Sequence, residues 1–210
     1  ERLPDVINAS GFTTTMPSLG VSRQNTDVLY FVTDREGGRG GLDLWFSLYN
    51  WKDKTWKEAK NCGKQVNTIG DEITPFYDVT TRTLYYSSDG MAGFGGFDIY
   101  KATGEGKSFN DIQNLGQPIN SSYDDLYYTI DESRRKGFLS SNRDGGYSLR
   151  NKNCCDDIYE FIYRDHIVVA VDGKVIGITD SIFYRSIEEE YERTHTVDIS
   201  KIEESDKAEI

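Results

Sequence analysis

The amino-acid sequence predicts an all-β fold made of repeated four-stranded sheets, and three observations support this prediction. The 210 residues include 14 tyrosines and 20 glycines, which is typical of strands joined by tight turns. Helical periodicity is absent through residues 10–165. A strand-like segment followed by a glycine cluster and an acidic residue occurs three times, and such self-similarity indicates a repeat architecture.

The repeat becomes visible when Leu29, Leu84 and Gly137 are aligned. The three segments read LYFVTDREGGRGGLDLW, LYYSSDGMAGFGGFDIY and GFLSSNRDGGYSLRNKNCCDDIY, at offsets of 55 and 53 residues. The loop of the third copy carries six additional residues. The segments that join the copies also repeat, because NCGKQVNTIGDE at 61–72 matches NLGQPINSSYDD at 114–125. Two motifs that recur at one period indicate equivalent structural units.

Each unit is predicted to hold four strands, which are clearest in the second copy. Aromatic and β-branched residues at 72–79 and 83–89 indicate two strands joined by a turn at Thr81 and Arg82. A glycine loop follows, and strands at 97–103 and 109–115 flank a Gly-Glu-Gly-Lys turn. Four short strands within about 54 residues are typical of one blade of a β-propeller.

We therefore expect three blades, near 12–60, 61–113 and 114–165, in a propeller region that spans residues 1–165. A closed propeller needs at least four blades, so these three are expected to be part of a larger ring. Residues 166–210 read as a strand-rich acidic segment, either a closing strand or the start of another unit. Its part from 188 to 210 holds nine acidic and three basic residues, and SIEEEYER could form a short helix.

The glycine clusters could be taken for phosphate-binding loops, but the sequence that follows them argues against this. In a dinucleotide site the glycines open a helix, whereas LDLW and FDIY alternate as strands do. We predict hairpins whose glycines turn the chain and whose polar residues accept hydrogen bonds from nearby turn amides. This structural role is assigned to Asp34, Gly38, Asp43, Asp89, Gly95, Asp98, Asn142, Gly146 and Asp157.

Charge and cysteine content exclude several classes of function. The net charge of −11 disfavours nucleic acid and anionic membranes as partners. No apolar run is long enough for a transmembrane helix, and no signal peptide opens the sequence. The three cysteines form no zinc-binding pattern, so we expect free thiols, with a disulfide as the alternative. The acidic pairs at 71–72 and 124–125 lack the spacing of an EF-hand, and no metal or cofactor is expected.

The motifs over about residues 12–163 resemble the WD40-like β-propeller repeat of the PD40 type. More narrowly, they are similar to the propeller of envelope proteins that also carry tetratricopeptide repeats, a carboxypeptidase-regulatory-like domain and an OmpA-like peptidoglycan-binding domain. This resemblance implies a six-bladed propeller and a periplasmic location in association with the outer membrane. Because neither tetratricopeptide repeats nor an OmpA-like domain is visible here, we expect a fragment, a chain with gaps, or strongly diverged further blades.

The resemblance also implies a scaffold or adaptor that acts through protein–protein contacts, in one branch as a component of type IX secretion tied to peptidoglycan. Its partners would be envelope proteins, including outer-membrane secretion components, with peptidoglycan bound through a domain outside this sequence. The alternatives are a propeller that binds glycans or peptidoglycan fragments, and a glycoside hydrolase that uses two carboxylates. Because the repeated aspartates are equivalent by position, and His166 and His195 lie outside the motifs, we expect the chain not to be an enzyme.

The six residues inserted in the third glycine loop are the place where this unit departs from the other two. An extended loop at one copy of a repeat is a candidate for recruitment to binding. The residues assigned to this candidate interaction loop are Tyr147, Arg150, Cys154 and Cys155.

Overall fold

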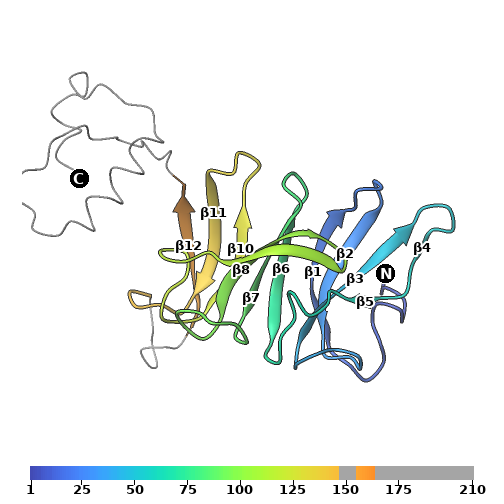
Figure 1. Ribbon diagram of the computed structural model, residues 1–210, viewed down its shortest axis with the longest axis horizontal. Coiled ribbons are helices and arrows are strands. Elements are labelled where there is room, and N and C mark those ends of the chain that lie inside the picture. Colours follow the sequence, from blue (N-terminus) through green and yellow to red (C-terminus); the bar gives the residue numbers. More distant parts are fainter. Residues whose placement is uncertain (147–154, 164–210) are drawn as a thin grey trace, which may run out of the picture. The chain divides into compact units, whose positions relative to one another are not determined.

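The computed structural model describes residues 1–146 and 155–163, and these residues form strands and turns without a helix (Figure 1). The predicted all-β class is therefore confirmed. The described strands belong to one compact unit that extends from Glu1 to Tyr163. The acidic segment at 166–210, with its suggested helix, lies outside the described residues.

The described strands form three antiparallel sheets, which we call sheets I, II and III. Sheet I contains β1 (Thr14–Val21), β2 (Asp27–Thr33), β3 (Asp43–Asn50), β4 (Thr55–Trp56) and β5 (Lys60–Asn61). Sheet II contains β6 (Glu72–Asp78), β7 (Thr83–Ser88), β8 (Asp98–Glu105) and β9 (Ser108–Asn114). Sheet III contains β10 (Asp125–Ile130), β11 (Lys136–Ser141) and β12 (Asp157–Ile162).

The predicted four-stranded unit appears in full only in sheet II, where the strands follow the order β6-β7-β8-β9. In sheet I the fourth position is divided, because the short strands β4 and β5 both pair with β3. Sheet III has three strands among the described residues. The described sheets do not form a closed ring, so the structure shows the repeated sheets and not a complete propeller.

The sheets pack in chain order, with the first strand of each sheet lying against the preceding sheet (Figure 1). Strand β6 contacts β1, β2 and β3, and β10 contacts β6, β7 and β8. Each interface has an aromatic centre: the rings of Tyr30 and Tyr77 stack at 4.9 Å, and those of Tyr85 and Tyr128 at 4.4 Å. Large, flat side chains bury much apolar surface per residue, which suits an interface between two sheets.

The same irregularity recurs in the first strand of every sheet. The register shifts between Thr15 and Ser18 in β1, and equivalent shifts occur in β6 and β10. The third residue of each strand, Met16, Thr74 or Tyr127, has a positive φ of 51°, 53° or 54°. A β-bulge of this kind increases the local twist, and its recurrence shows that the three sheets are equivalent in detail.

The outer face of sheet I is covered by the first residues of the chain. Ile7 is buried against Leu29, Phe31 and Trp45 of this face. The guanidinium of Arg35 donates to the carbonyl oxygens of Val6 at 3.1 Å and of Ile7. This group also lies 5.2 Å from the centre of the Trp45 ring, a distance suited to a cation–π contact.

Candidate functional site

The aspartate that opens the third strand of each sheet points back into the glycine loop. In sheet II, Asp98 accepts hydrogen bonds from the amides of Phe94 at 2.7 Å and Gly95 at 3.3 Å. In sheet I, Asp43 accepts from the amides of Arg39 and Gly40 and from the Asn61 side chain. Burial raises the pKa of Asp98 above its usual value, and the loop amides oppose that shift.

Three other repeat residues accept hydrogen bonds from amides that lie far away in the sequence. The prediction that they bind amides of their own turn is therefore wrong. Asp34 accepts from the amide of Thr13 at 2.7 Å, and Asp89 accepts from the amide of Asp71 at 2.7 Å. Asn142 accepts from the amide of Asp124 at 2.9 Å. Each of these side chains therefore fixes the residue that precedes the first strand of its own sheet.

The glycines assigned to the repeat have two different surroundings. A Cβ on Gly38 or Gly146 would collide with the carboxylate of Asp43 or Asp157, so these two positions leave room for the inward aspartate. A Cβ on Gly95 would instead meet the backbone carbonyl of Tyr123, at the segment that leads into the next sheet. Gly95 is thus needed for close passage of two backbones, a use of glycine that the motif alone does not distinguish.

The segments that lead into the sheets share one geometry, and we call them connectors. In the first connector (61–72), the side chain of Asn67 accepts from the Leu44 amide at 2.9 Å and donates to the Leu44 carbonyl at 2.9 Å. In the second connector (114–125), Asn120 makes the same pair of bonds to Ile99, at 2.8 and 2.9 Å. Both asparagines are 1% exposed. Each one joins a connector to the third strand of the sheet before it.

This asparagine occupies the same position in the 61–72 and 114–125 motifs, so the repeat in the sequence could have identified it, but it was not among the predicted repeat residues. The carboxylates that follow it complete the link. Asp71 accepts from the Leu42 amide at 2.7 Å, and Asp124 accepts from the Phe97 amide at 2.9 Å. Asparagine is suited to this place because its amide group holds a donor and an acceptor side by side, as a strand backbone does.

The predicted interaction loop is only partly described. Tyr147, Arg150 and Cys154 lie outside the described residues, so their assignment remains a prediction. Cys155 is exposed and disulfide-bonded, which fits the alternative that we considered for the cysteines. Cys62 is a free thiol in the core between sheets I and II, where burial raises its pKa far above the usual range.

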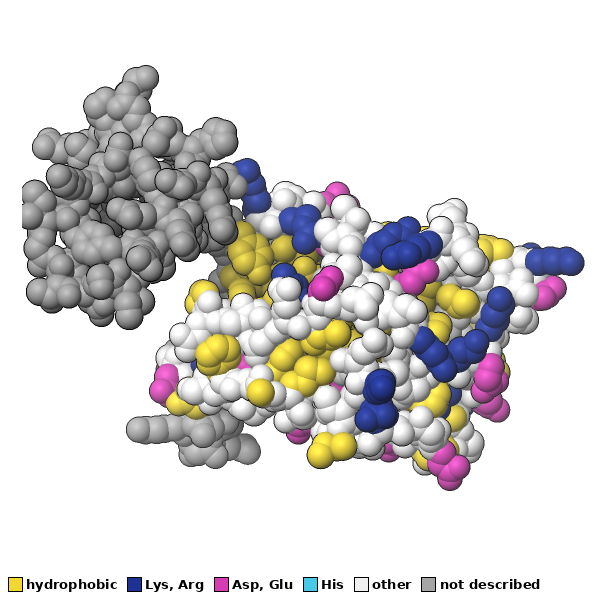
Figure 2. All heavy atoms as spheres, in the orientation of Figure 1, with side chains coloured by type: hydrophobic (Ala, Val, Ile, Leu, Met, Phe, Trp, Pro, Cys, Tyr) yellow, Lys and Arg dark blue, Asp and Glu magenta, His cyan; other side chains and the backbone are white. Residues whose placement is uncertain are grey.

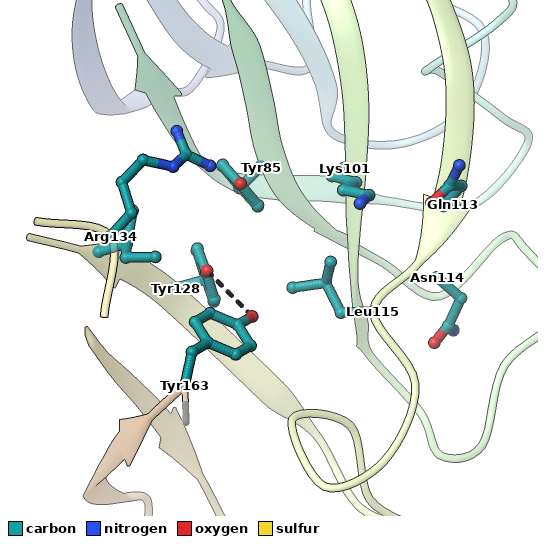
Figure 3. A pocket seen from close by; sticks show the side chains of 9 residues that line it. Tyr85, Lys101, Gln113, Asn114, Leu115, Tyr128, Arg134 and Tyr163 are labelled. Atoms are coloured by element: carbon teal, nitrogen blue, oxygen red, sulfur yellow. Dashed lines mark hydrogen bonds between the residues drawn. The ribbon is translucent and has the colours of Figure 1, made fainter. Parts of the chain in front are cut away.

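A pocket of about 370 Å³ opens between sheets II and III (Figure 3), and its lining of aromatic, polar and basic side chains makes it a candidate binding site. One wall comes from sheet II and the segment after it, and the other from β10, its turn and the residue after β12. Figure 3 shows the Arg134 side chain extending toward Tyr85 and the hydroxyl groups of Tyr128 and Tyr163 meeting at 3.4 Å. The lining residues are Tyr85, Lys101, Gln113, Asn114, Leu115, Tyr128, Ile130, Arg134 and Tyr163.

The pocket lies where two residues depart from the repeat. Lys101 occupies the position that Phe46 holds in sheet I, because Lys101 pairs with Tyr85 as Phe46 pairs with Tyr30. Gly137 takes the position of Leu84, and the ring of Phe161 on the neighbouring strand fills the space beside it. Within the described residues no strand of sheet III corresponds to β9, whose Phe109 is buried in the core between sheets I and II.

Aromatic rings form a row at the base of this pocket. The ring of Tyr128 stacks on Tyr85 at 4.4 Å and on Phe161 at 5.1 Å, and Phe161 meets the edge of Tyr163 at 5.3 Å. Burial raises the pKa of Tyr85 and Tyr128, so both hydroxyl groups stay protonated and can donate hydrogen bonds at neutral pH.

The rim of the pocket is basic, although the chain as a whole is acidic. Lys101 and Arg134 line it, and none of its nine lining residues is an aspartate or glutamate. Arg134 forms an ion pair with Asp78, a residue outside the lining, whereas Lys101 has no carboxylate partner within the described part of the chain. On the face shown in Figure 2, basic side chains are scattered among hydrophobic and acidic ones.

The described residues hold neither a cluster of metal ligands nor a membrane-spanning helix. No group of three or more His, Cys, Asp or Glu side chains in residues 1–146 and 155–163 is placed to hold a metal ion. Within the same residues there is no helix of the length and apolarity that crossing a membrane would need.

Comparisons with known proteins add a distant structural likeness. No family model matches the sequence, and no curated protein matches it. Among solved structures, the chain is similar to an endo-arabinase from Bacteroides thetaiotaomicron VPI-5482, with 15% identity and a TM-score of 0.46. The likeness covers 80% of this chain and 61% of that chain.

This likeness corrects one prediction made from the sequence. We expected the chain not to be an enzyme because its repeated aspartates are equivalent by position, yet the similar structure belongs to an enzyme. The positional equivalence of the aspartates therefore does not exclude catalysis. A likeness at this level of identity and TM-score assigns no activity to the chain.

Proposed function

We propose that this chain binds a glycan in the pocket between sheets II and III, with a preference for saccharides that carry a carboxylate. The observation behind the proposal is the lining of that pocket, which combines an aromatic base with a rim of polar and basic side chains. Sugars present both C–H faces and hydroxyl groups, so they match such a lining better than a purely apolar ligand does.

The charge of the pocket supports the preference for acidic saccharides. Lys101 and Arg134 both line the pocket, and Lys101, which has no carboxylate partner among the described residues, can form charge-assisted hydrogen bonds to a carboxylate of the ligand. Peptidoglycan fragments and uronic-acid oligosaccharides belong to this class of ligand.

Calorimetric titration of the purified chain with acidic and neutral oligosaccharides of equal length tests the proposal. Lys101→Met should weaken binding of the acidic ligand by about 10- to 100-fold, because a hydrogen bond to a charged group contributes about 1.5–3 kcal/mol. Lys52→Met is the matched control, since Lys52 is an exposed lysine in the turn before β4. Equal affinities for both variants, or tighter binding of the neutral ligand, would contradict the proposal.

A second candidate function is protein–protein interaction, and a different surface favours it. Sheet III exposes Phe138, Ile158 and Ile162 on one face, and grouped exposed apolar side chains are typical of a protein contact surface. We propose that the three sheets are blades of a β-propeller that is completed by further sheets. The periplasmic location, the secretion partner and the link to peptidoglycan remain predictions that come from the sequence resemblance.

A further inference from the structure

The hairpin between β3 and β4 carries a compact group of three aromatic side chains. The ring of Tyr49 meets that of Trp51 at 4.9 Å and that of Trp56 at 5.0 Å, with the ring planes inclined at 83° and 63°. Tyr49 and Trp56 lie directly opposite one another in the strand pair, so their side chains are on the same face of the hairpin. We call Tyr49, Trp51 and Trp56 the aromatic triad.

Two rings of the triad have no counterpart in sheet II. Three positions after the equivalent residues 46 and 101, sheet I has Tyr49 and sheet II has Gly104. The turn of the hairpin is also longer in sheet I, where residues 51–54 take the place of residues 106–107. Trp51 lies within this longer turn. The triad is therefore a feature that sheet I has gained beyond the repeated pattern.

Side-chain hydrogen bonds fix the turn that holds Trp51. The Oδ1 atom of Asn50 accepts from the amides of Lys52 at 3.1 Å and Asp53 at 3.4 Å, and its Nδ2 atom donates to the Asp53 carboxylate at 2.5 Å. Lys54 completes the turn with a positive φ of 55°. A ring that is held on a fixed turn loses less conformational freedom when a ligand binds.

The triad lies beside a groove. Tyr49 and Trp56 line this groove, which has a volume of about 680 Å³, and residues of the segment 1–6 line it from the other side. Trp56 packs against the apolar cluster on the outer face of sheet I, whereas Trp51 is 64% exposed. The triad thus combines a ring anchored in the fold with a ring that is open to solvent, and the groove has the size of a site for a small ligand.

The chemistry of the groove suits a polar, uncharged ligand that has apolar faces. Its lining includes the hydroxyl group of Thr55 and charged side chains of both signs, Glu1, Arg2 and Lys54. Arg2 also forms an ion pair with Asp5 at 2.8 Å. A lining with both signs of charge gives an ionised ligand little advantage. A saccharide presents C–H faces to aromatic rings and hydroxyl groups to polar side chains.

A proline-rich peptide is another common occupant of aromatic grooves. Such a peptide is an extended helix and needs aromatic rings spaced along its length. In the triad, however, both tryptophan rings are gathered within 5.0 Å of the single ring of Tyr49. This compact arrangement favours a sugar ring over an extended peptide.

We propose that the aromatic triad binds a neutral saccharide, with one sugar ring stacked on Trp51 and the neighbouring sugar in the groove. The site lies on sheet I and shares no residue with the pocket between sheets II and III, so the inference does not depend on the function proposed for that pocket. We expect the triad to bind its ligand more weakly than that pocket binds an acidic saccharide, because a neutral ligand brings no charge to pair.

Titration of the whole chain with neutral hexaoses of glucose, xylose and mannose tests this inference. Two of the three tryptophans belong to the triad, and the third, Trp45, is only 7% exposed, so ligand binding should change the tryptophan fluorescence in a saturable way. Calorimetry gives the affinities of the variants. Trp51→Ala should weaken binding by about tenfold, whereas Trp51→Phe keeps a ring and should bind within about threefold of the wild type.

Phe94→Ala is the matched control, because Phe94 is an exposed aromatic residue of the glycine loop in sheet II, and its affinity for the hexaose should equal that of the wild type. Lys101→Met should also leave this affinity unchanged, so failure of either site is seen separately. The absence of saturable binding, equal affinities of the wild type and Trp51→Ala, or binding of a polyproline peptide in place of every hexaose would overturn the inference. Circular dichroism of each variant confirms that the fold is retained.

Discussion

Asn120→Ala should destabilise the fold strongly, because this one side chain links sheet III to sheet II. The substitution removes the hydrogen bonds to the amide and carbonyl of Ile99, at 2.8 and 2.9 Å, and a third bond to Asn114 at 2.7 Å. Ile99 and Asn120 are both buried, so water does not readily replace the lost partners. A buried polar group left without a partner costs about 1–3 kcal/mol.

Two such groups on Ile99 give an expected loss of about 2–6 kcal/mol in the free energy of unfolding. For a domain of this size, each kcal/mol lowers the melting temperature by about 2–4 °C, so we expect a drop of about 4–24 °C. Thermal unfolding followed by circular dichroism measures this change. Asn110→Ala is the matched control, because Asn110 is an exposed asparagine of β9.

The equivalent residue provides an internal check. Asn67→Ala removes the corresponding bonds to Leu44, at 2.9 Å each, and one to Asn61 at 3.0 Å, so its effect should match that of Asn120→Ala. If Asn120→Ala melted within about 2 °C of Asn110→Ala, the reasoning from buried, unsatisfied backbone groups would be refuted. A large effect at only one of the two connectors would refute their equivalence.

Two further outcomes are expected. Burial raises the pKa of the fully buried Glu72 above its usual 4.5, so the wild type loses stability as pH rises from about 4.5 through the folded pKa. Glu72→Gln has no carboxyl to titrate, so its free energy of unfolding should increase relative to that of the wild type over this pH range. Denaturant titrations at several pH values measure both free energies, and a difference that does not change with pH would contradict the prediction. Gly137→Ala should lower the melting temperature by about 3–10 °C, because the alanine Cβ would collide with the Phe161 ring and the Thr129 carbonyl oxygen. An unchanged melting temperature would contradict this and show that the Phe161 ring can move aside.

The sequence predicted the sheets well because each strand has local signals that repeat. Alternating aromatic and β-branched residues, glycine loops and an aspartate before the third strand recur within each period, so chance similarity is a poor explanation. The prediction of all-β structure follows from these local patterns. The number of strands per sheet was less predictable, because the fourth strand lies at the edge and its pattern is weak, as the division between β4 and β5 shows.

The long-range links between segments could not be predicted from local patterns. Asp34 and Asp89 were expected to bind turn amides, which is what short acidic side chains do in isolated turns. In the folded chain their partners lie 21 and 18 residues earlier, brought close only when the sheet forms. The positive φ at Met16, Thr74 and Tyr127 was equally hidden, because three unrelated residue types adopt it.

Residues 3–13 show how a repeat can be present and yet missed. They share with both connectors the apolar residue and asparagine at 7–8, but Pro4 stands where the connectors have Gly63 and Gly116, and the acidic pair is absent. The backbone bond from Asn8 to Pro4 identifies them, since it reproduces the bonds at Asn67 and Asn120. A proline carbonyl accepts as well as a glycine carbonyl does, so the geometry persists where the letters have changed.

In a repeated fold, a residue that departs from the repeat says more about function than one that conforms to it. The aspartates common to the copies accept hydrogen bonds from the glycine loops or from the residues that precede the first strand of each sheet. Lys101 differs, because it places a charge where its counterpart Phe46 is buried in the core. Ile158 conforms in type but is exposed where its counterparts are covered. A cation that replaces core bulk indicates a ligand site, and an apolar position that recurs in every sheet but is covered in only two indicates that sheet III lacks a covering neighbour among the described residues. Lys101 lies on β8 of sheet II and Ile158 on β12 of sheet III, so the two positions can be tested by separate substitutions.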